Sequence, residues 1–477
     1  AGHLKLNNLI LIYDNNNISI DGSTDLAFSD NTNLRFKSVN WEVHSGKGHD
    51  HKNIYKLLKK AQISKVPCLL NFKTTIGFGS PNKSAKASSH GSPLGSEEVK
   101  LTRSKLSWNE KPFQIPDKLL KIWRNSSTKN LQIYKKTKSI SHTTLSNKDI
   151  DKLFNKIEID LKDFKSDQAT RKSSEAILHY FKEDHPILGG SADLTGSNNT
   201  KGKQMSVLDS MNTAGQYIHY GVREHGMAAI MNGIAATKIY TTYSGTFLSF
   251  ADYMKPSLRL AALMKINPIQ VFTHDSIGLG EDGPTHQPIE QINMLRLIPN
   301  SYVFRPCDLK ETIVCWREAL KINDAPSFIC LSRQNLPQIS NKKLDSKKFK
   351  GAYVIYGPKI NNDITIIATG SEVSLAVNIA ERIRDNGIIA KVISMPSTSV
   401  FEKQSKTFKN NLLKSKSSET FVIEAGSTMY WNKYTKYENI FGLDNFGASA
   451  PGNEVFRKFG LTTETVSSKI IRKIRTK

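Results

Sequence analysis

Residues 364–396, ITIIATGSEVSLAVNIAERIRDNGIIAKVISMP, constrain the possible folds more than any other stretch of the chain. An apolar run from Ile364 leads to a turn at Gly370, and a second apolar run precedes Pro396. Between them, four apolar residues share one helical face: Val373, Ala376, Ala380 and Ile383. Ser371 is a suitable N-cap and Gly387 a suitable C-terminal stop for this helix. A strand–helix–strand unit of this kind predicts a doubly wound α/β domain with parallel strands.

Other apolar runs along the chain also end in polar residues, as strands followed by loops do. Strands are expected within residues 9–13, 66–75, 185–194, 269–276 and 327–335, and helices at 171–181 and 224–236. Leu9 to Tyr13 is a continuous apolar run, typical of a strand buried on both faces of a parallel sheet. Ligands of open α/β sheets bind at the carboxyl ends of such strands. Residues from Ser80 to about Ile150 are rich in Ser, Lys, Asn and Pro and predict loops, short helices and a linker.

The composition limits the kinds of partner. Sixty-seven Lys and Arg against 43 Asp and Glu give a net charge of +24, which suits nucleic acid, a membrane surface or phosphorylated metabolites. The lysines are scattered and no nucleic-acid motif accompanies them, so a solvated basic surface is the simpler interpretation. No apolar run approaches the ~18 residues of a membrane span. Four cysteines lack CxxC spacing and predict small core residues in a reducing, cytoplasmic setting: Cys68, Cys307, Cys315 and Cys330.

Eight segments carry a family resemblance, and they occur in order along nearly the whole chain. They are DNNNISIDG (14–22), IGFGSPNK (76–83) with SSHGSPLG (88–95), GGSADLTGSN (189–198), YIHYGVREHGM (217–227), YSGTFLSFADY (243–253), THDSIGLGEDGPTHQP (273–288) and LSRQNLP (331–337). The sequence resembles the transketolase family, which implies three doubly wound α/β domains of the thiamine-diphosphate-binding fold. Three domains are expected. Residues 1–150 would form the latter part of a diphosphate-binding domain, which is therefore incomplete, together with a linker. Residues 151–340 would form the pyrimidine-binding domain, and residues 341–477 the C-terminal domain. The implied reaction moves a two-carbon ketol unit between sugar phosphates, in the pentose phosphate pathway, through the ylid of thiamine diphosphate, and the implied catalytic unit is a homodimer with the site at its interface.

The resemblance assigns roles around the cofactor. Glu224 corresponds to the carboxyl group that shares a proton with the aminopyrimidine ring, and burial would suit it by raising its pKa. Alone, an acidic residue at this helix start would equally complement the helix dipole. Phe247, Phe250 and Tyr253 correspond to the pyrimidine pocket, with Phe250 stacking on the ring, although aromatic residues at this helical spacing usually form core. The remaining cofactor contacts implied are Asp193, Leu194 and His90.

Metal binding is expected at the loop after the first strand. Asn16 and the backbone carbonyl of Ile18 correspond to two ligands of the cation that holds the diphosphate, and oxygen donors suit Mg²⁺ or Ca²⁺. An Asn-rich turn is the plainer interpretation of the same residues. The family's acidic ligand, in an upstream Gly-Asp-Gly motif, lies before the first residue of this sequence. His90, the expected catalytic histidine near the diphosphate, has Ala87 where some relatives carry a second histidine.

Sugar phosphate contacts are implied for four residues: Arg171, Ser197, His274 and Arg333. Arginine offers a planar fork of donors to phosphate oxygens. Asp282 corresponds to the partner of a substrate hydroxyl, and His286 can shuttle protons near neutral pH. The glycines of residues 273–288 let the backbone approach a ligand. The histidine spacing and the absence of nearby cysteine exclude a zinc motif in this stretch.

Three alternatives remain at this point. Dihydroxyacetone synthase shares the motifs but takes formaldehyde as acceptor, and the four phosphate contacts argue against it. A non-catalytic transketolase-like protein is favoured by the lack of the upstream metal motif and opposed by the motif around Glu224. A basic nucleic-acid binder is the most distant. We expect the 477 residues alone to bind thiamine diphosphate negligibly, because the upstream acidic ligand and covering helices are needed.

Overall fold

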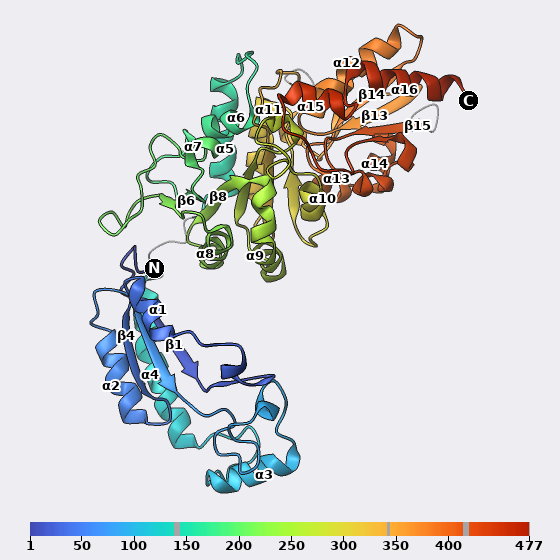
Figure 1. The fold of residues 1–477 in the computed structure, drawn as a ribbon. Helices are drawn as coiled ribbons and strands as arrows, with labels where there is room; N and C mark the ends of the chain where they lie inside the picture. Colours follow the sequence, from blue (N-terminus) through green and yellow to red (C-terminus); the bar gives the residue numbers. More distant parts are fainter. Residues whose placement is uncertain (138–143, 341–343, 414–418, 477) are drawn as a thin grey trace. The chain divides into compact units, whose positions relative to one another are not determined.

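The computed structural model describes residues 1–137, 144–340, 344–413 and 419–476. These residues form two compact units. The first consists of Ala1–Ser141 with Asp209–Thr213, and the second of His142–Leu208 with Ala214–Lys477. The first unit contains one small parallel sheet, and the second contains two larger sheets with helices on both faces of each (Figure 1). The chain is therefore an α/β protein, as the strand–helix–strand pattern predicts.

The sheet of the first unit has three parallel strands in the order β1-β5-β4. β5 (Cys68–Lys73) lies between β1 (Ile10–Asn15) and β4 (Glu42–Lys47). Helices α1 (Thr32–Ser38) and α2 (His51–Ala61) pack on β4 and β5. A short hairpin of two-residue strands, β2 and β3, follows β1. The predicted strand within residues 66–75 is therefore confirmed and takes the central place.

The first apolar run is not buried on both faces, contrary to the prediction. Leu9, Leu11 and Ile12 are 41%, 41% and 55% exposed. The reason is topological: β1 stands at the edge of its sheet and pairs only with β5 among the described strands. An edge strand presents unpaired backbone groups, and here it also presents apolar side chains to solvent. Such a surface suits cover by further polypeptide.

The polar stretch after Ser80 is more helical than predicted. It contains α3 (Ser96–Lys105) and α4 (Asp117–Thr137), and α4 is 21 residues long. Four large hydrophobic side chains of α4 are more than half exposed: Leu119, Ile122, Trp123 and Tyr134. The prediction was wrong because a Lys-, Asn- and Ser-rich composition suggests a loop even where the chain forms a long helix.

The first sheet of the second unit has six parallel strands in the order β10-β11-β9-β8-β6-β7. The strands are β6 (Ile187–Ser191), β7 (Tyr217–His219), β8 (Thr241–Phe247), β9 (Ile269–Thr273), β10 (Tyr302–Phe304) and β11 (Ser327–Leu331). One face packs on α5 (Asn147–Asp160), α6 (Thr170–Leu178) and α11 (Leu309–Lys321). The other packs on α8 (Glu224–Ala236), α9 (Ala251–Met264) and α10 (Gln291–Arg296), so the strands are buried on both sides (Figure 1).

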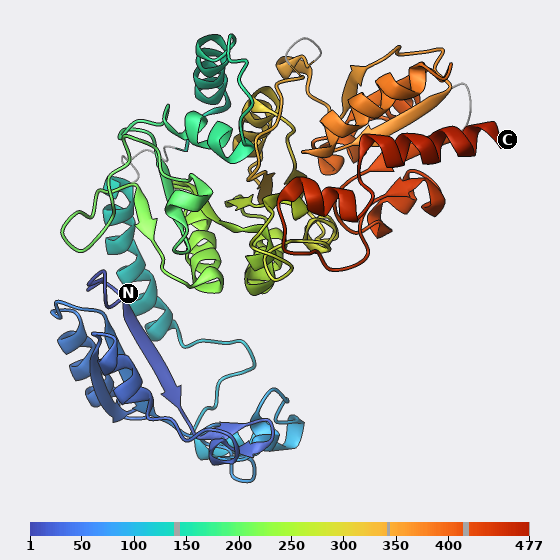
Figure 2. The same cartoon turned by 45° about the horizontal axis from the view of Figure 1, so that its top comes forward.

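The second sheet of this unit has five strands in the order β12-β14-β13-β15-β16. The strands are β12 (Tyr353–Tyr356), β13 (Ile364–Ala368), β14 (Ala390–Ser394), β15 (Glu419–Ile423) and β16 (Ile440–Phe441). All pairs are parallel except the pair of β12 with β14. Helices α12 (Glu372–Arg384) and α16 (Thr463–Arg475) cover one face, and α13 (Thr398–Glu402) and α14 (Lys406–Leu413) the other (Figure 2).

The strand–helix–strand unit at residues 364–396 is confirmed as β13, α12 and β14. Gly387 follows α12 with a φ of +77°, the left-handed conformation typical of a helix stop. Ser371 precedes the helix, but its hydroxyl donates to the Glu372 carboxylate and caps no backbone N–H, contrary to the prediction. The Glu372 side chain draws this hydroxyl because it takes part in a buried charge cluster.

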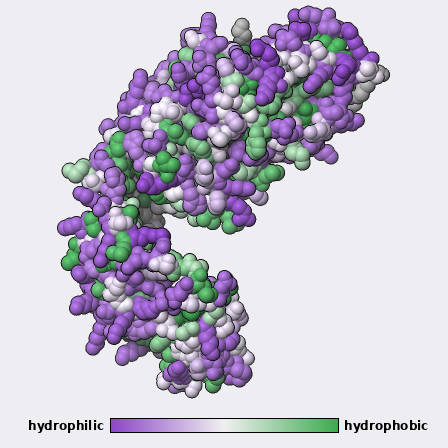
Figure 3. Space-filling model, in the orientation of Figure 1, coloured by the Kyte–Doolittle hydropathy of each residue, from purple (hydrophilic) through white to green (hydrophobic). Residues whose placement is uncertain are grey.

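The prediction that the cysteines are core residues is confirmed. All four cysteines are buried and free of disulfides. Within the described ranges, no helix has the length and apolarity required to cross a bilayer. In the view of Figure 3 hydrophilic residues predominate, interrupted by small hydrophobic patches.

Candidate functional site

Several candidate residues lie at one edge of the six-stranded sheet. β6, β8, β9 and β11 neighbour one another in parallel, so their carboxyl ends meet at the same edge. His274 follows β9, Arg333 follows β11, and Phe250 follows β8. Asp193, with a left-handed φ of +62°, and Leu194 follow β6. This is the edge at which open α/β sheets bind ligands.

His274 is fixed at this edge by its neighbours. Its side chain is buried, and its ring stacks on Phe247 with centroids 3.7 Å apart. Nδ1 lies 2.9 Å from Thr273 Oγ1, which in turn donates to Asn198 Oδ1 at 2.7 Å. The backbone of His274 has a φ of +61°, an uncommon conformation outside glycine. Such strain is kept where the surroundings over-determine a residue, and it clusters at functional sites.

Positive charge converges around His274. Burial, followed by the nearby Arg171, Arg333 and His286, lowers the pKa of this imidazole to about 3. Burial and the charge of Arg333 also lower the pKa of the Arg171 guanidinium. Arg171 Nη1 donates to the Ser197 carbonyl, while no partner for the buried Nε exists within the described ranges. An anion bound here would relieve the mutual repulsion and satisfy the free donor.

The segments that carry the two arginines are joined by hydrogen bonds from backbone N–H groups to side-chain hydroxyls. The Thr170 N–H donates to Ser332 Oγ at 3.0 Å, and the Ser332 N–H donates to Thr170 Oγ1 at 2.7 Å. Both residues are buried and immediately precede Arg171 and Arg333. These reciprocal bonds fix the backbone positions from which the two planar guanidinium groups extend.

An aromatic wall adjoins the cationic residues. Phe247 and Phe250 are stacked with centroids 5.7 Å apart and an interplanar angle of 14°. Phe250 is half-buried and Tyr253 is 65% exposed, so these two rings are not simple core residues. The His286 ring lies 5.5 Å from Phe250, which brings the two ends of residues 273–288 to the same wall. An exposed aromatic face beside cations suits a flat ring that carries an anionic tail.

Glu224 is the first residue of α8 and is half-buried in this chain. The burial expected for a proton-sharing carboxyl is therefore incomplete here. Among the described residues its carboxylate has no hydrogen bond or ion pair, so it stays available to a ligand. Ser197 and Asp282 are exposed, which also leaves their side chains accessible.

A buried charge cluster supports the loop that begins at His274. Arg305 Nε donates to Asp275 Oδ2 at 2.8 Å, and Arg305 Nη1 pairs with Glu372 Oε2. Arg296 makes two bonds of 2.7 Å to the Glu424 carboxylate, which lies 3.7 Å from Arg305. Burial alone would lower the pKa of Arg305, but the surrounding carboxylates raise it. The cluster joins Asp275, next to the cationic site, to both α12 and β15 of the five-stranded sheet.

The same loop is clamped further along by Gln287. Its Nε2 donates to the carbonyls of Gly280 and Ala448 at 2.8 and 2.9 Å, and its Oε1 accepts from the Ala448 N–H at 2.9 Å. Ser449 Oγ donates to the Glu281 carbonyl at 2.7 Å. Gly280 and Gly283 have positive φ values, which the tight turn between these bonds requires. Residues of the five-stranded domain thus hold the loop that carries Asp282 and His286.

The candidate residues of the first unit are arranged more loosely. Asn16 Oδ1 accepts a hydrogen bond from the Ile18 N–H at 3.0 Å, so it closes a local turn. Both residues are half-buried, and His90 is exposed. Asn16 and the Ile18 carbonyl are the predicted cation ligands and lie two residues apart on one hairpin. A cation there would need further oxygen ligands.

A different trio could also hold a metal. Glu42, His44 and Cys68 bring their ligand atoms within 4.8 Å of one another at the amino ends of β4 and β5. His44 Nε2 lies 2.8 Å from Glu42 Oε1. A hydrogen bond from Ser64 and the nearby His44 lower the pKa of Glu42, because they outweigh burial, which would raise it. A simple ion pair accounts for this geometry, and the trio lies at the opposite sheet edge from Asn16.

Comparison with known families matches three successive parts of the chain. Residues 1–153 match the thiamine diphosphate binding domain of transketolase, 166–338 its pyrimidine binding domain, and 351–462 the transketolase-like C-terminal domain. A transketolase of Buchnera aphidicola subsp. Schizaphis graminum is 42% identical over 98% of this chain and 74% of that protein. Transketolase 2 of Escherichia coli K12 is 41% identical over 98% and 73%. The chain belongs to the transketolase family.

Solved transketolases have the same fold. The Pichia stipitis enzyme in complex with sedoheptulose 7-phosphate superposes with a TM-score of 0.90 at 37% identity, covering 100% of this chain and 73% of that one. The Campylobacter jejuni transketolase gives 0.86 at 39% identity, covering 99% and 74%. A split-gene transketolase described as an inactive β4 tetramer shares the fold at 21% identity and a TM-score of 0.52. The predicted family and its three-domain α/β fold are confirmed.

The sequence did not single out Arg305 and Gln287, the residues that hold the loop after β9. Arg305 follows β10 in the string FRPCDLKE, where an arginine after a short strand is more often a surface residue. Gln287 lies within the quoted motif but carries no charge to mark it. Asp275 lies within the quoted motif next to His274, yet its partner Arg305 is 30 residues away. No single-sequence signal links such distant residues.

Proposed function

We propose that this protein transfers a two-carbon ketol unit from a ketose phosphate to an aldose phosphate, as a thiamine-diphosphate-dependent transketolase. The observation that carries the proposal is the convergence of Arg171, His274 and Arg333 at the carboxyl edge of the six-stranded sheet. The same constellation favours phosphorylated acceptors over formaldehyde. We place the reaction in the cytoplasm and in the pentose phosphate pathway, with domain boundaries near residues 150 and 340.

The residues fit the cofactor on two counts. The exposed face of Phe250 offers a platform for an aminopyrimidine ring, and the Glu224 carboxylate is unpaired within the described ranges. When bound, thiamine diphosphate would supply the carbon nucleophile and electron sink for the ketol unit. Glu224 would hold a proton at the ring nitrogen, and Asp193 and Leu194 would contact the cofactor. Asn16 and the Ile18 carbonyl, with His90 nearby, would bind Mg²⁺ or Ca²⁺ and the diphosphate.

At the substrate, each side chain has a defined task. Arg171, Ser197, His274 and Arg333 would bind and orient the phosphate and the distal hydroxyls. Asp282 would accept a hydrogen bond from a substrate hydroxyl. His286 would move protons to and from the sugar oxygens.

We further propose that catalysis needs a homodimer and polypeptide additional to these 477 residues. Glu224 is only half-buried, and a partner subunit would complete its burial. The exposed Leu9, Leu11 and Ile12 of β1 support a further covering segment, on the same gene product or as a separate subunit. The two transketolases above also support a further segment, because the match covers only about three quarters of their length.

The test is titration calorimetry and ketol-transfer assay of the 477-residue protein with thiamine diphosphate and Mg²⁺. We expect negligible binding and no turnover alone, and turnover after addition of the unmatched quarter of the Buchnera transketolase. Micromolar binding and turnover by the chain alone would contradict the need for a further segment. Cofactor binding without turnover in the complemented sample would contradict ketol transfer and indicate a non-catalytic relative.

The phosphate contact has its own test in the complemented enzyme. Arg333→Ala should raise KM for phosphorylated donors and leave hydroxypyruvate nearly unaffected. Loss of a charge-assisted hydrogen bond of about 1.5–3 kcal/mol corresponds to roughly a ten- to hundredfold change in selectivity. The exposed Arg384→Ala is the matched control. Equal losses for both donors would show that Arg333 is structural.

A further inference from the structure

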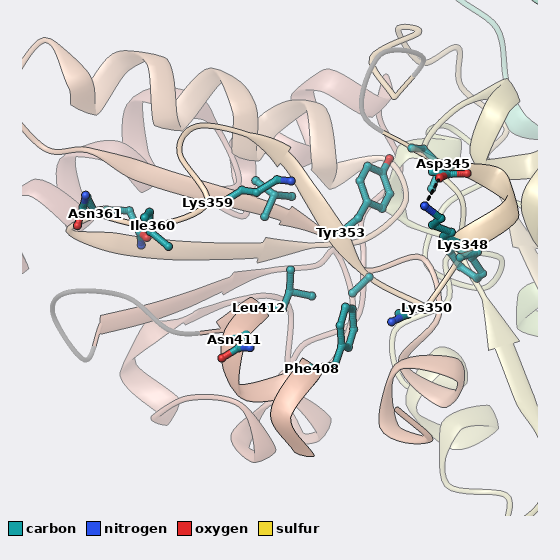
Figure 4. A pocket seen from close by; sticks show the side chains of 15 residues that line it. Asp345, Lys348, Lys350, Tyr353, Lys359, Ile360, Asn361, Phe408, Asn411 and Leu412 are labelled. Atoms are coloured by element: carbon teal, nitrogen blue, oxygen red, sulfur yellow. Dashed lines mark ion pairs between the residues drawn. The ribbon is translucent and has the colours of Figure 1, made fainter. Parts of the chain in front are cut away.

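The polar groups of the second unit differ in how firmly their protons are placed. Beside β12, Asp345 and Lys348 line a cavity of about 760 Å³ (Figure 4). Their side chains lie 3.9 Å apart and are 57% and 82% exposed, so water competes for their hydrogen bonds. Next to His274, in contrast, a row of hydrogen bonds lies in the interior. There the neighbouring protein groups alone decide which atom donates and which accepts.

This row runs from the end of β6 to His274. Ser191 ends β6, Asn198 ends the short helix α7 (Thr195–Asn198), and Thr273 ends β9. All three residues are fully buried, and His274 is 3% exposed. Asn198 Nδ2 donates to Ser191 Oγ at 3.2 Å, and Thr273 Oγ1 donates to Asn198 Oδ1 at 2.7 Å. Thr273 Oγ1 also lies 2.9 Å from His274 Nδ1, so the row reaches the imidazole.

The backbone carbonyl of Gly245 sets the direction of the row, because a carbonyl only accepts. Ser191 Oγ lies 3.1 Å from this carbonyl and 3.3 Å from the Leu194 nitrogen. Its single proton therefore points to Gly245, and one lone pair accepts from the Leu194 N–H. The remaining lone pair requires the amino group of Asn198. Turning the Asn198 amide over would draw the Ser191 proton away and leave the contact with Gly245 without one.

The same count of protons reaches His274. Asn198 presents Oδ1 to Thr273, so Thr273 gives its only proton to that oxygen. The separation of 2.7 Å is the usual one for a hydroxyl donating to an oxygen. Thr273 then has only a lone pair for His274 Nδ1, which must carry the ring proton. Burial and the nearby cations lower the pKa of His274 to about 3, so the ring has no second proton at neutral pH.

The other ring nitrogen, Nε2, is left with a lone pair. It makes no hydrogen bond to the described residues. Arg171 and Arg333 lie near the imidazole, and their positive charge favours a lone pair there over an N–H. The two guanidinium groups only donate, whereas Nε2 in this form only accepts.

We infer that Asn198 and Thr273 hold His274 as the Nδ1–H tautomer, so that Nε2 binds a ligand only through a proton which the ligand supplies. Asn198 and Thr273 are positioning residues, since they act through His274. The tautomer is a property of the free protein. The identity of the ligand rests on the proposed function, in which His274 contacts a sugar phosphate.

A sugar phosphate offers that proton from two places. A hydroxyl of the sugar would donate directly to Nε2. The phosphate has a second pKa of about 6, so at higher pH it has lost its proton and must take one up from solvent to share it with Nε2. The two sources therefore differ in the number of protons that binding takes up.

Nitrogen-15 NMR of the intact 477-residue protein, labelled at histidine, tests the tautomer. The His274 signals are assigned by their loss in His274→Asn. At about pH 7 we expect Nε2 at the position of a ring nitrogen with a lone pair and Nδ1 at that of a protonated one. A protonated Nε2 in the parent would overturn the inference.

Two variants test whether the row sets this state. Thr273→Val keeps the shape but removes the acceptor of Nδ1–H, and Asn198→Ala frees the Thr273 proton to point at Nδ1. Both should move the Nε2 signal toward the protonated position. The control is Thr246→Val, which removes a buried hydroxyl of β8 that has no partner within the described ranges, and it should change nothing. An Nε2 signal unchanged in both variants would overturn the role of the row.

The ligand is tested in the complemented enzyme with ribose 5-phosphate and no ketose donor. Its binding should shift the Nε2 signal, and binding without a shift would overturn the role of Nε2 as acceptor. Calorimetry at about pH 8 in two buffers of different ionisation enthalpy counts the protons. Uptake of about one proton would identify the phosphate as partner, and none would identify a sugar hydroxyl. Failure of ribose 5-phosphate to bind would count against the proposed function and leave the measured tautomer standing.

Discussion

The loops that follow β9 and β1 both leave the carboxyl end of a parallel strand, yet they are held very differently. After β9, His274 and Asp275 are almost fully buried, and Arg305 and Gln287 tie their loop to the five-stranded domain. After β1, Asn16 makes one local hydrogen bond beside an exposed edge strand. One part of the candidate site is thus arranged in advance, whereas the other depends on what covers it.

This difference separates two tasks that the proposed function assigns to different units. The second unit contains the cationic and aromatic groups for the sugar phosphate and the pyrimidine ring. The first contains the groups assigned to the cation and the diphosphate. Preorganised groups need little ordering when a ligand binds, whereas loosely held ones must be ordered at that moment. Variants that loosen the loop after β9 should therefore lower the stability strongly. Variants in the loop after β1 should lower it only slightly.

The largest effect should come from Arg305→Met. The variant leaves the buried carboxylates of Asp275 and Glu372 without their cation, and breaking a buried pair in this way costs about 3–5 kcal/mol. Urea unfolding measures the loss of stability, and hydrogen exchange in peptides of residues 272–288 measures the loosening of the loop. Arg382→Met is the matched control, since its pair with Glu464 at 3.8 Å is half-exposed and is worth about 0–1 kcal/mol. Equal losses for both variants would mean that the cluster does not support the loop.

His274 should make stability depend on pH. Its pKa is about 3 in the folded chain against 6.5 for the ordinary group, so the unfolded state binds the extra proton between these values. Stability therefore rises with pH through this window, and the folded chain should be about 2 kcal/mol less stable at about pH 5 than at about pH 7.5 from this residue alone.

His274→Asn should remove that part of the pH dependence. The unfolding free energies of the variant and the parent are measured at the two pH values. Their difference gives the contribution of His274, because the contributions of the other titrating groups cancel. The exposed His51→Asn is the control. Identical pH profiles for the parent and His274→Asn would show that the imidazole is not held neutral by its surroundings.

Gln287→Ala should have an intermediate effect. It removes the donors to the Gly280 and Ala448 carbonyls and leaves the Ala448 N–H without its acceptor, at a cost of about 1–2 kcal/mol. In the complemented enzyme, kcat should fall while the binding of hydroxypyruvate changes little, because His286 and Asp282 lose their position. Gln404→Ala, which removes a single bond to the Val400 carbonyl, is the control. An unchanged kcat would argue that the loop holds its position without the clamp.

The smallest effect on stability should come from Asn16→Ala. It removes one half-exposed hydrogen bond, so the unfolding free energy should fall by about 0.5 kcal/mol. The same variant should abolish cation-dependent cofactor binding in the complemented enzyme, measured by calorimetry with Mg²⁺. A large loss of stability would contradict the loose arrangement of this loop. Unchanged cofactor binding would remove Asn16 from the cation site.

Local periodicity and resemblance account for much of what could be predicted. The strand–helix–strand unit at 364–396 was readable because β13, α12 and β14 are each buried in the way their patterns require. The motif around His274 was readable because its residues are contiguous. The family assignment followed from several such motifs in a fixed order.

The remainder depends on contacts that sequence cannot show. The apolar run after Leu9 has the pattern of a buried strand, and only the strand order places it at an edge. The helical pattern of α4 is embedded in a Lys-, Asn- and Ser-rich stretch, where composition alone favours a loop. Arg305 and Asp275 meet only when β9 and β10 lie in one sheet, and Gln287 and Ala448 meet only when the five-stranded domain packs on the six-stranded one. Both pairings are therefore properties of the tertiary structure.

Hydrogen–deuterium exchange of the intact 477-residue protein, without ligands, tests the central claim most directly. Amides of residues 273–280 should exchange much more slowly than those of residues 16–24, because only the first set lies in a buried loop held by Arg305 and Gln287. Addition of the unmatched quarter of the Buchnera transketolase should slow exchange in residues 16–24 and leave residues 273–280 unchanged. Equal exchange in the two loops of the isolated chain, or the reverse order, would contradict the account.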